Sequence, residues 1–367
     1  MNMLFQSAHI GSLTLPNRLV RSATAERMAD PDGRPRSQLE TLYQELVQGG
    51  VGLIVTGHMF VHPSGKAHPE MTGIHSDELI PDLTELSNAV HQKGGQVVVQ
   101  INHGGMQCSR ETMPSLETTI APSAVNLPFL AQPAREMTPD EIVQTIQAYG
   151  QAARRVKEAG FDGVQIHAAH GYLIGQFLSP LVNRRTDEWG GGLEGRMCFL
   201  RAVCRVVREQ VGPDYLVLIK LGMMDGVEGG LTADEGAQVV AALEGMDLDA
   251  VEISGGIGGR NLNTRTGIRS AADEAYFRPL AQKARPATRL PIILVGGFRS
   301  RQVMEKVLAS GDADFISLCR PLICEPDLPN RLREGLQERS SCISANRCWP
   351  AGTEEGIACK CQLERPS

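Results

Sequence analysis

The sequence predicts a (β/α)8 TIM barrel, a closed ring of parallel strands that alternate with helices. Short and almost continuously apolar segments recur about eight times, as a parallel sheet buried on both faces requires. Segments with the apolar spacing of helices separate them. The length of 367 residues suits one such barrel with insertions. A doubly wound open sheet is the alternative architecture for the same alternation.

The amino-terminal segments lead into this pattern. Residues 4–16 alternate apolar and polar side chains around Gly11, which predicts a β-hairpin that forms a lid on one end of the fold. The first barrel strand is expected at residues 19–22. An amphipathic helix is expected from about residue 37 to residue 49, because three leucines share one of its faces.

The remaining barrel strands are expected at residues 53–57, 97–101, 163–168, 216–222, 250–256, 291–297 and 314–320. The clearest helix is expected at residues 139–158. Thr138 and Glu141 have the spacing of a capping box, proline occupies the first helical position, and Gly160 follows the last turn.

Composition excludes several classes of function. The net charge of -6 and the scattered basic residues argue against binding to nucleic acid or to an anionic membrane surface. The start of the chain lacks a charged-then-apolar leader, and no apolar run reaches about 18 residues, which predicts a cytoplasmic protein without a membrane span. The 9 cysteines are an odd number, which disfavours a disulfide framework. Small-molecule chemistry is the expectation that remains.

The strongest functional signal follows the strand expected at residues 163–168. His167 and His170 are an odd number of positions apart, so an unbroken strand would point them to opposite faces. They converge only if the strand stops and the chain turns, which Gly171 makes easier. Tyr172 follows that turn. Satisfied core histidines with a packing tyrosine are the alternative for each group alone, but three such groups at one strand end favour a functional site.

Other predicted strand ends are glycine-rich or polar, and in a barrel these ends surround the active site. Gly296 and Gly297 expose backbone N–H groups, and Arg320 supplies a fork of donors after the last strand. Together they suit a phosphate, which implies a cofactor that carries one.

Lys220 ends an otherwise apolar strand. A lysine inside a barrel is rarely tolerated without a partner, so we expect it to face an electron-rich group. An ion pair with Asp225 or Glu252 is the structural alternative.

Several motifs occur in one order along residues 4–329: IGSLTLPNRLVRSAT, QINHGG, IHAAHGYLIGQFLSPLVNRRTDEWGGGLEGR, IKL followed by GGLT, and LVGGFRS followed by LCRP. By these motifs the chain resembles the Old Yellow Enzyme-like NADH:flavin oxidoreductases, flavin-dependent barrels that reduce activated alkenes. The resemblance implies an FMN-binding barrel over residues 1–335. Residues 336–367 form a cysteine-containing tail that is not an independent domain.

The resemblance also implies roles for single residues. FMN would be bound by Ser22, Ala23, Thr24, Ala25, His58, Gln100, Lys220, Gly296, Gly297, Cys319 and Arg320. Gln100 would bond the pyrimidine edge, and Lys220 would lie where negative charge accumulates in reduced flavin. His167 and His170 would bind the carbonyl oxygen of an α,β-unsaturated substrate, and Tyr172 would protonate its α-carbon. The implied activity is ping-pong reduction of such substrates with NADH or NADPH.

Three positions depart from the family pattern. Many relatives carry cysteine or threonine at the position of Ala25, arginine at that of Met106, and arginine at that of Lys220. Lysine keeps the charge but loses the forked hydrogen bonding of arginine. The tuning of the flavin is therefore expected to differ from that of these relatives.

The tail resembles a degenerate cysteine segment of the dienoyl-CoA reductase-like branch, with Ala345 in place of a cysteine. An iron–sulfur or zinc site is the weaker alternative for this segment. It would use Cys342, Cys348, Cys359 and Cys361. No second nucleotide-binding domain follows, so NADH or NADPH is expected to reduce FMN directly.

Two other functions and the state of assembly stay open at this point. His167 and His170 could instead be metal ligands of a barrel hydrolase, although no convincing set of acidic residues completes that site. The chain could also bind flavin without turnover. Its association into a homo-oligomer is left open as well.

Overall fold

The computed structural model describes residues 3–108, 112, 118–128, 133–258, 265–349 and 356–361. The barrel strands are β3 (Leu19–Arg21), β4 (Leu53–Val55), β6 (Val97–Asn102), β9 (Gly163–Ala168), β10 (Leu216–Gly222), β11 (Ala250–Ser254), β12 (Ile292–Leu294) and β13 (Phe315–Leu318). Neighbours in the ring are parallel and follow chain order. Pairing of Ile316 with Leu19 joins β13 to β3 and closes the ring, so the predicted barrel is confirmed and the open sheet is wrong.

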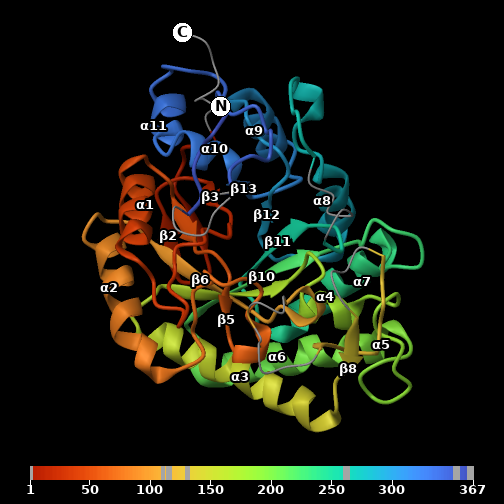
Figure 1. Ribbon diagram of the computed structural model, residues 1–367. Coiled ribbons are helices and arrows are strands. Elements are labelled where there is room, and N and C mark those ends of the chain that lie inside the picture. Colours follow the sequence, from red (N-terminus) through yellow and green to blue (C-terminus); the bar gives the residue numbers. More distant parts are fainter. Residues whose placement is uncertain are drawn as a thin grey trace.

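The helices lie outside this ring (Figure 1). They are α1 (Ser37–Gln48), α2 (Ile80–His91), α3 (Pro139–Glu158), α4 (Leu173–Leu178), α5 (Leu193–Arg196), α6 (Cys198–Val211), α7 (Ala233–Leu243), α8 (Arg278–Ala284), α9 (Arg301–Ala309), α10 (Arg320–Cys324) and α11 (Leu328–Arg333). α3 begins at the predicted capping box, in which the Glu141 amide donates to Thr138 Oγ1 at 3.2 Å. Among the described helices, none is both long and apolar enough to cross a bilayer.

Shorter elements fill the connections. The remaining strands are β5 (Met59–Phe60), which pairs with β6, and the parallel pair β7 (Thr119–Ala121) and β8 (Ala134–Glu136). The 3-10 turns are η1 (Pro63–Gly65), η2 (Asp77–Leu79), η3 (Gly105–Gln107), η4 (Glu244–Met246), η6 (Ala271–Asp273) and η7 (Arg285–Ala287).

The predicted amino-terminal lid is present. β1 (Ala8–Ile10) and β2 (Leu13–Leu15) form an antiparallel hairpin. Ile10 and Leu15 pack in one buried cluster with residues from the first halves of the barrel strands, such as Leu53 and Leu216. The hairpin therefore closes the amino-terminal end of the barrel and leaves the opposite end for chemistry.

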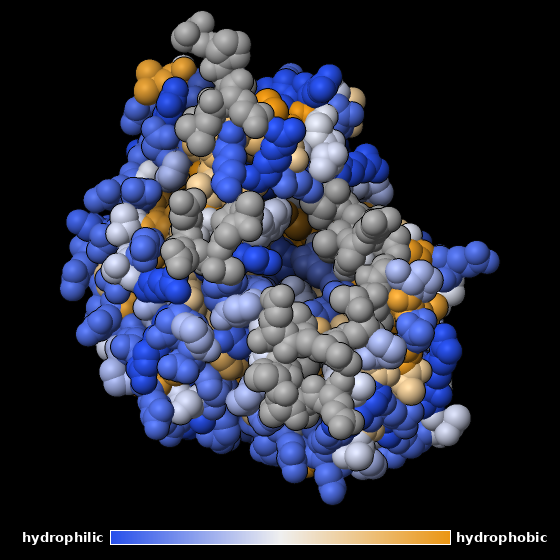
Figure 2. Space-filling model, in the orientation of Figure 1, coloured by the Kyte–Doolittle hydropathy of each residue, from blue (hydrophilic) through white to orange (hydrophobic). Residues whose placement is uncertain are grey.

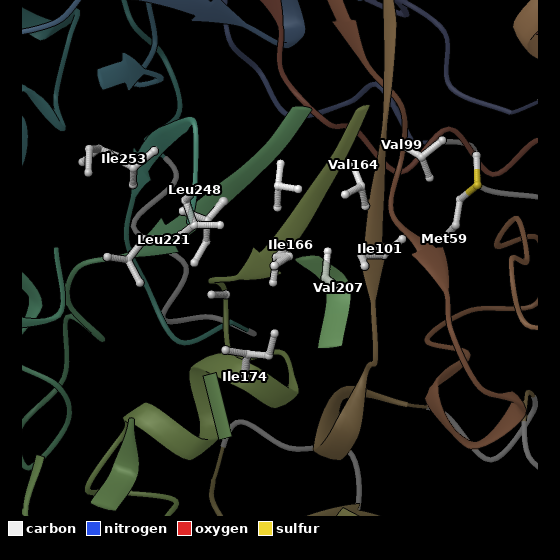
Figure 3. Close-up of a cluster of buried hydrophobic side chains, with 14 of the residues drawn as sticks. Met59, Val99, Ile101, Val164, Ile166, Ile174, Val207, Leu221, Leu248 and Ile253 are labelled. Atoms are coloured by element: carbon white, nitrogen blue, oxygen red, sulfur yellow. The ribbon is translucent and has the colours of Figure 1, made fainter. Parts of the chain in front are cut away.

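Alternation along the strands points one set of side chains outward into an apolar core and the other set into the barrel, where the apolar residues near the lid give way to polar groups. Val164 and Ile166 of β9 point outward and pack in one cluster with Ile101 of β6 and Val207 of α6 (Figure 3). The residue between the two on β9, Gln165, is fully buried and bonds Glu252 across the barrel. The same periodicity that builds the outer core thus delivers polar groups to the barrel centre.

Candidate active site

A pocket with about 1250 Å³ of empty volume, open solvent included, lies at the carboxyl ends of the barrel strands. A recess walled in part by hydrophilic residues is visible on the face shown in Figure 2. Every residue predicted to bind cofactor lines the pocket except Gly296, and so do all three predicted catalytic residues. The lining members of these sets are Ser22, Ala23, Thr24, Ala25, His58, Gln100, His167, His170, Tyr172, Lys220, Gly297, Cys319 and Arg320.

The turn after β9 brings the predicted catalytic side chains together. His170 has φ of 58° and Gly171 has φ of 70°, so two consecutive left-handed residues reverse the chain. A Cβ on Gly171 would lie 1.6 Å from the Ile257 carbonyl oxygen, which leaves no space for another residue. The ring centroids of His167 and His170 lie 5.2 Å apart. The predicted convergence is therefore confirmed.

Burial keeps these histidines neutral. It lowers the pKa of His170 to about 3 and the pKa of His167 well below its ordinary value. His170 Nε2 lies 2.7 Å from Ser254 Oγ, which orients the ring. His167 Nδ1 is buried and has no hydrogen-bond partner within the described part of the chain. A neutral imidazole has one donor and one acceptor, so this atom is suited to a bound ligand.

Tyr172 lines the same pocket as the two histidines. Its ring centroid lies 4.9 Å from that of His167 and 5.0 Å from that of His58. Burial raises the pKa of Tyr172 to about 12. The phenol is therefore protonated at neutral pH and has a proton to donate.

A buried charge network forms the floor of the pocket. Lys220 Nζ lies 2.9 Å from Glu252 Oε1 and donates to Ser22 Oγ at 2.7 Å. Ser22 and Ser317 donate to the same carboxylate at 2.7 and 2.9 Å. Gln165 donates to its other oxygen at 3.1 Å. The alternative pairing of Lys220 with Glu252 is thus present, although Lys220 also lines the pocket.

The ionised form of Glu252 is stabilised by its neighbours. Burial alone would raise the pKa of this carboxyl, but Lys220 and the hydroxyl of Ser22 bring it below its ordinary value. Asp225, the other partner considered for Lys220, instead accepts from Ser179 Oγ at 2.6 Å. The positive charge of Lys220 is therefore balanced inside the barrel.

The opposite end of the pocket carries Arg320, the first residue of α10. Its Nη1 donates to the Arg265 carbonyl at 2.9 Å, to Asn346 Oδ1 at 2.6 Å and to the Ser344 carbonyl at 3.3 Å. Gly297 has φ of 73°, and a Cβ there would lie 2.7 Å from the Tyr276 ring. Arg320 and Gly297 thus line one pocket, whereas Gly296 does not, and the phosphate site expected from these residues stays a prediction.

Sequence reasoning missed several residues of the pocket. Ser344, Asn346 and Trp349 reach it from the carboxy-terminal tail, and Tyr276 and Gln107 reach it from connections between barrel elements. No local motif marks them, because long-range packing sets their positions. Glu252, by contrast, was considered from the sequence as a partner of Lys220, and it lies in register with Lys220 on the neighbouring strand. Met106, flagged as a departure from the family pattern, is buried in a separate apolar cluster.

The cysteines do not assemble a metal centre in the described residues. No group of three or more histidine, cysteine, aspartate or glutamate side chains there is arranged to hold a metal ion, and this applies to the His167 and His170 pair as well as to the tail. All 9 cysteines lie in the described residues, and none of them forms a disulfide bond there. Cys359 instead approaches Cys324, which was not among the four cysteines considered as ligands.

Comparison with known proteins gives related flavoproteins. The model of a family described as the NADH:flavin oxidoreductase / NADH oxidase family matches residues 3–339. The NADH oxidase of Thermoanaerobacter brockii is 37% identical over 346 residues, which cover 94% of this chain and 52% of the oxidase. The NADPH dehydrogenase of Geobacillus sp. (strain WCH70) is 33% identical, with coverage of 95% and 98%. The chain thus spans about half the length of the first of these relatives.

Solved structures agree with this similarity. A 2-naphthoyl-CoA reductase in complex with 2-naphthoyl-CoA superposes with a TM-score of 0.87 at 29% identity, over 95% of this chain and 54% of that one. Morphinone reductase in complex with tetrahydroNAD superposes with a TM-score of 0.80 at 27% identity, over 96% and 94% of the two chains.

Proposed function

This chain belongs to the NADH:flavin oxidoreductase / NADH oxidase family, and from that premise we propose that it reduces the activated C=C bond of α,β-unsaturated carbonyl compounds. The family assigns it FMN as cofactor and NADH or NADPH as reductant. The substrate class is our proposal. The observation that carries it is the meeting of His167, His170 and Tyr172 around one space at the barrel mouth.

The residues of the pocket fit FMN. Arg320 and the backbone of Gly297 line the pocket and offer a cation and an N–H group, and we place the phosphate there. Lys220 supplies a second cation at the floor, and Gln100 lines the same pocket. Gln100 is the residue we assign to the pyrimidine edge. A dianionic phosphate and a ring system that becomes negative on reduction both find positive partners in this donor set.

We propose that His167 and His170 bind and orient the substrate. Each neutral ring can donate one N–H to a carbonyl oxygen, and Ser254 holds the ring of His170 in place. These donors draw electron density from the β-carbon and stabilise the negative charge that develops on the oxygen. Bound FMN supplies the hydride that this activated carbon accepts. Tyr172 then provides the proton for the α-carbon.

A visible spectrum tests the proposal. The purified protein is expected to be yellow, to bleach with NADH or NADPH without oxygen, and to regain its colour when cyclohexenone is added. A reduced sample kept without enone is the control for leakage of oxygen. A colourless protein that does not take up FMN would contradict the whole assignment. If none of a panel of enones reoxidises the reduced flavin, only the proposed substrate class is contradicted.

The negative charge of Glu252 weakens the electrostatic effect of Lys220 on the cofactor. Glu252→Gln keeps the shape of the side chain but removes its negative charge, so Lys220 is left uncompensated. We expect the flavin midpoint potential to rise by on the order of 30 mV, since the reduced ring is stabilised. A redox titration with a reference dye measures the shift, with Glu209→Gln on the exposed face of α6 as control. An unchanged or lower potential in a folded, FMN-loaded variant would refute this role.

A further inference from the structure

Three cysteines between positions 324 and 359 meet near Arg320. Cys324 is the last residue of α10, whereas Cys342 and Cys359 belong to the tail. Cys359 Sγ lies 2.8 Å from Cys324 Sγ, and Cys342 also forms a hydrogen bond with Cys324. Cys324 and Cys359 are half-buried, and Cys342 is buried. One sulfur atom, that of Cys324, thus has two sulfur partners.

We propose that Cys324 is the shared sulfur of a thiol–disulfide switch, bonded to Cys359 when the tail is fastened to α10. A disulfide bond is about 2.05 Å long, so the two sulfur atoms need to close by less than about 1 Å. A peroxide is the oxidant class required. One thiol breaks the peroxide O–O bond and becomes a sulfenic acid, and the second thiol then displaces water to form the S–S bond. Two thiols are oxidised, and one peroxide is reduced to an alcohol and water.

Cys342 is placed to open this disulfide by thiol–disulfide exchange within the same chain. In the reduced protein the hydrogen bond from Cys324 lowers the pKa of Cys342, and the charges of Arg320 and Arg299 favour the same thiolate whether or not Cys324 is oxidised. Attack of this thiolate on Cys324 forms the Cys324–Cys342 bond and breaks the Cys324–Cys359 bond. Cys359 leaves as a thiolate and takes up a proton. The end of the tail is then no longer tied to α10.

The tail contacts the pocket, so its attachment to α10 is expected to affect the pocket. Ser344 and Asn346 hold the guanidinium of Arg320 through their oxygen atoms. Trp349 lines the pocket, and these three residues all lie between Cys324 and Cys359 in sequence. The proposed disulfide therefore closes a loop around the residues that fix Arg320. Oxidation is expected to hold that side of the pocket shut.

Peptide mapping of the FMN-loaded protein tests the chemistry. After one equivalent of hydrogen peroxide, alkylation and digestion, we expect the Cys324–Cys359 peptide pair, and dithiothreitol should remove it. Cys359→Ser is expected to divert oxidation to the Cys324–Cys342 pair, and Cys324→Ser is expected to abolish both. Cys361→Ser, two residues from Cys359, is the matched control and should behave as the wild type. A wild-type protein that stays reduced, or that forms a pair without Cys324, would overturn the proposal.

The effect on the pocket has its own readout. We expect the oxidised protein to release FMN on the order of tenfold more slowly than the reduced protein, because a cross-link restricts opening of the tail. Protease cleavage within the tail should slow in parallel, and this measurement does not depend on the flavin. Both differences should persist in Cys361→Ser and vanish in Cys324→Ser. Equal release and equal cleavage in the two redox states would refute the switch even if the disulfide forms.

Discussion

Tyr172→Phe is expected to slow reduction of an enone by roughly 10²- to 10⁴-fold, the range by which a positioned general acid accelerates proton transfer. The phenol is the proton donor that we place over the substrate site, and burial keeps it protonated by raising its pKa to about 12. Reduction of bound FMN by NAD(P)H needs no proton from this residue and should stay within a few-fold of wild type. Anaerobic stopped-flow measurement of the two half-reactions separates these effects.

Tyr276 provides the control for this variant. It also lines the pocket, and burial raises its pKa too, but its ring stacks edge-on against Phe277 with centroids 4.6 Å apart. Tyr276→Phe should leave the ratio of the two half-reactions unchanged. If Tyr172→Phe slowed both half-reactions equally, or neither, the role of general acid would have to be withdrawn.

Mild acid is expected to destabilise the fold through its buried histidines. Burial lowers the pKa of His103 and His170 to about 3 and that of His58 and His75 to about 4. In the unfolded chain these rings titrate near 6.5, so between about pH 6.5 and pH 4 the unfolded state binds protons that the folded state does not. The free energy of unfolding should therefore fall as the pH drops, by up to about 1.4 kcal/mol per pH unit for each such ring.

Urea unfolding of the FMN-loaded protein at pH 7.5, 6.5 and 5.5 measures this dependence above the range in which carboxylates titrate. His103→Gln removes one buried ring. The free energy of unfolding should then change less steeply with pH, by the contribution of about one proton. His9→Gln, in the exposed part of the lid, is the matched control and should leave the slope as it is. A free energy of unfolding that does not change from pH 7.5 to pH 5.5 would contradict the prediction.

The parts of the fold that depend on neighbouring residues could be predicted from the sequence. Short, almost continuously apolar runs marked the barrel strands, and Thr138 with Glu141 marked the start of α3, because strand and capping signals are local. The spacing of His167 and His170 required a turn, and the left-handed residues supply it. Strand boundaries were less accurate: β12 covers only Ile292–Leu294 within the expected residues 291–297.

The parts that depend on distant pairing could not be predicted in the same way. Whether Lys220 faced a cofactor or an acidic residue was undecided, and it does both because the register of β10 and β11 puts Glu252 beside it. Asn346 and Trp349 reach the pocket only because the tail folds back across the barrel. The partner of Cys359 is Cys324, which lies in a helix rather than in the cysteine-rich segment. Nothing in the local sequence specifies such contacts.

The closure of β13 onto β3 has a consequence for how the protein is made. Leu19 leaves the ribosome almost 300 positions before its partner Ile316 is translated. β3 thus keeps one edge unpaired until β13 has been made, and an unpaired edge exposes a nascent chain to aggregation. Arg320, Ser344 and Asn346 emerge later still. Complete binding of FMN is therefore expected only after these residues of the tail have been made.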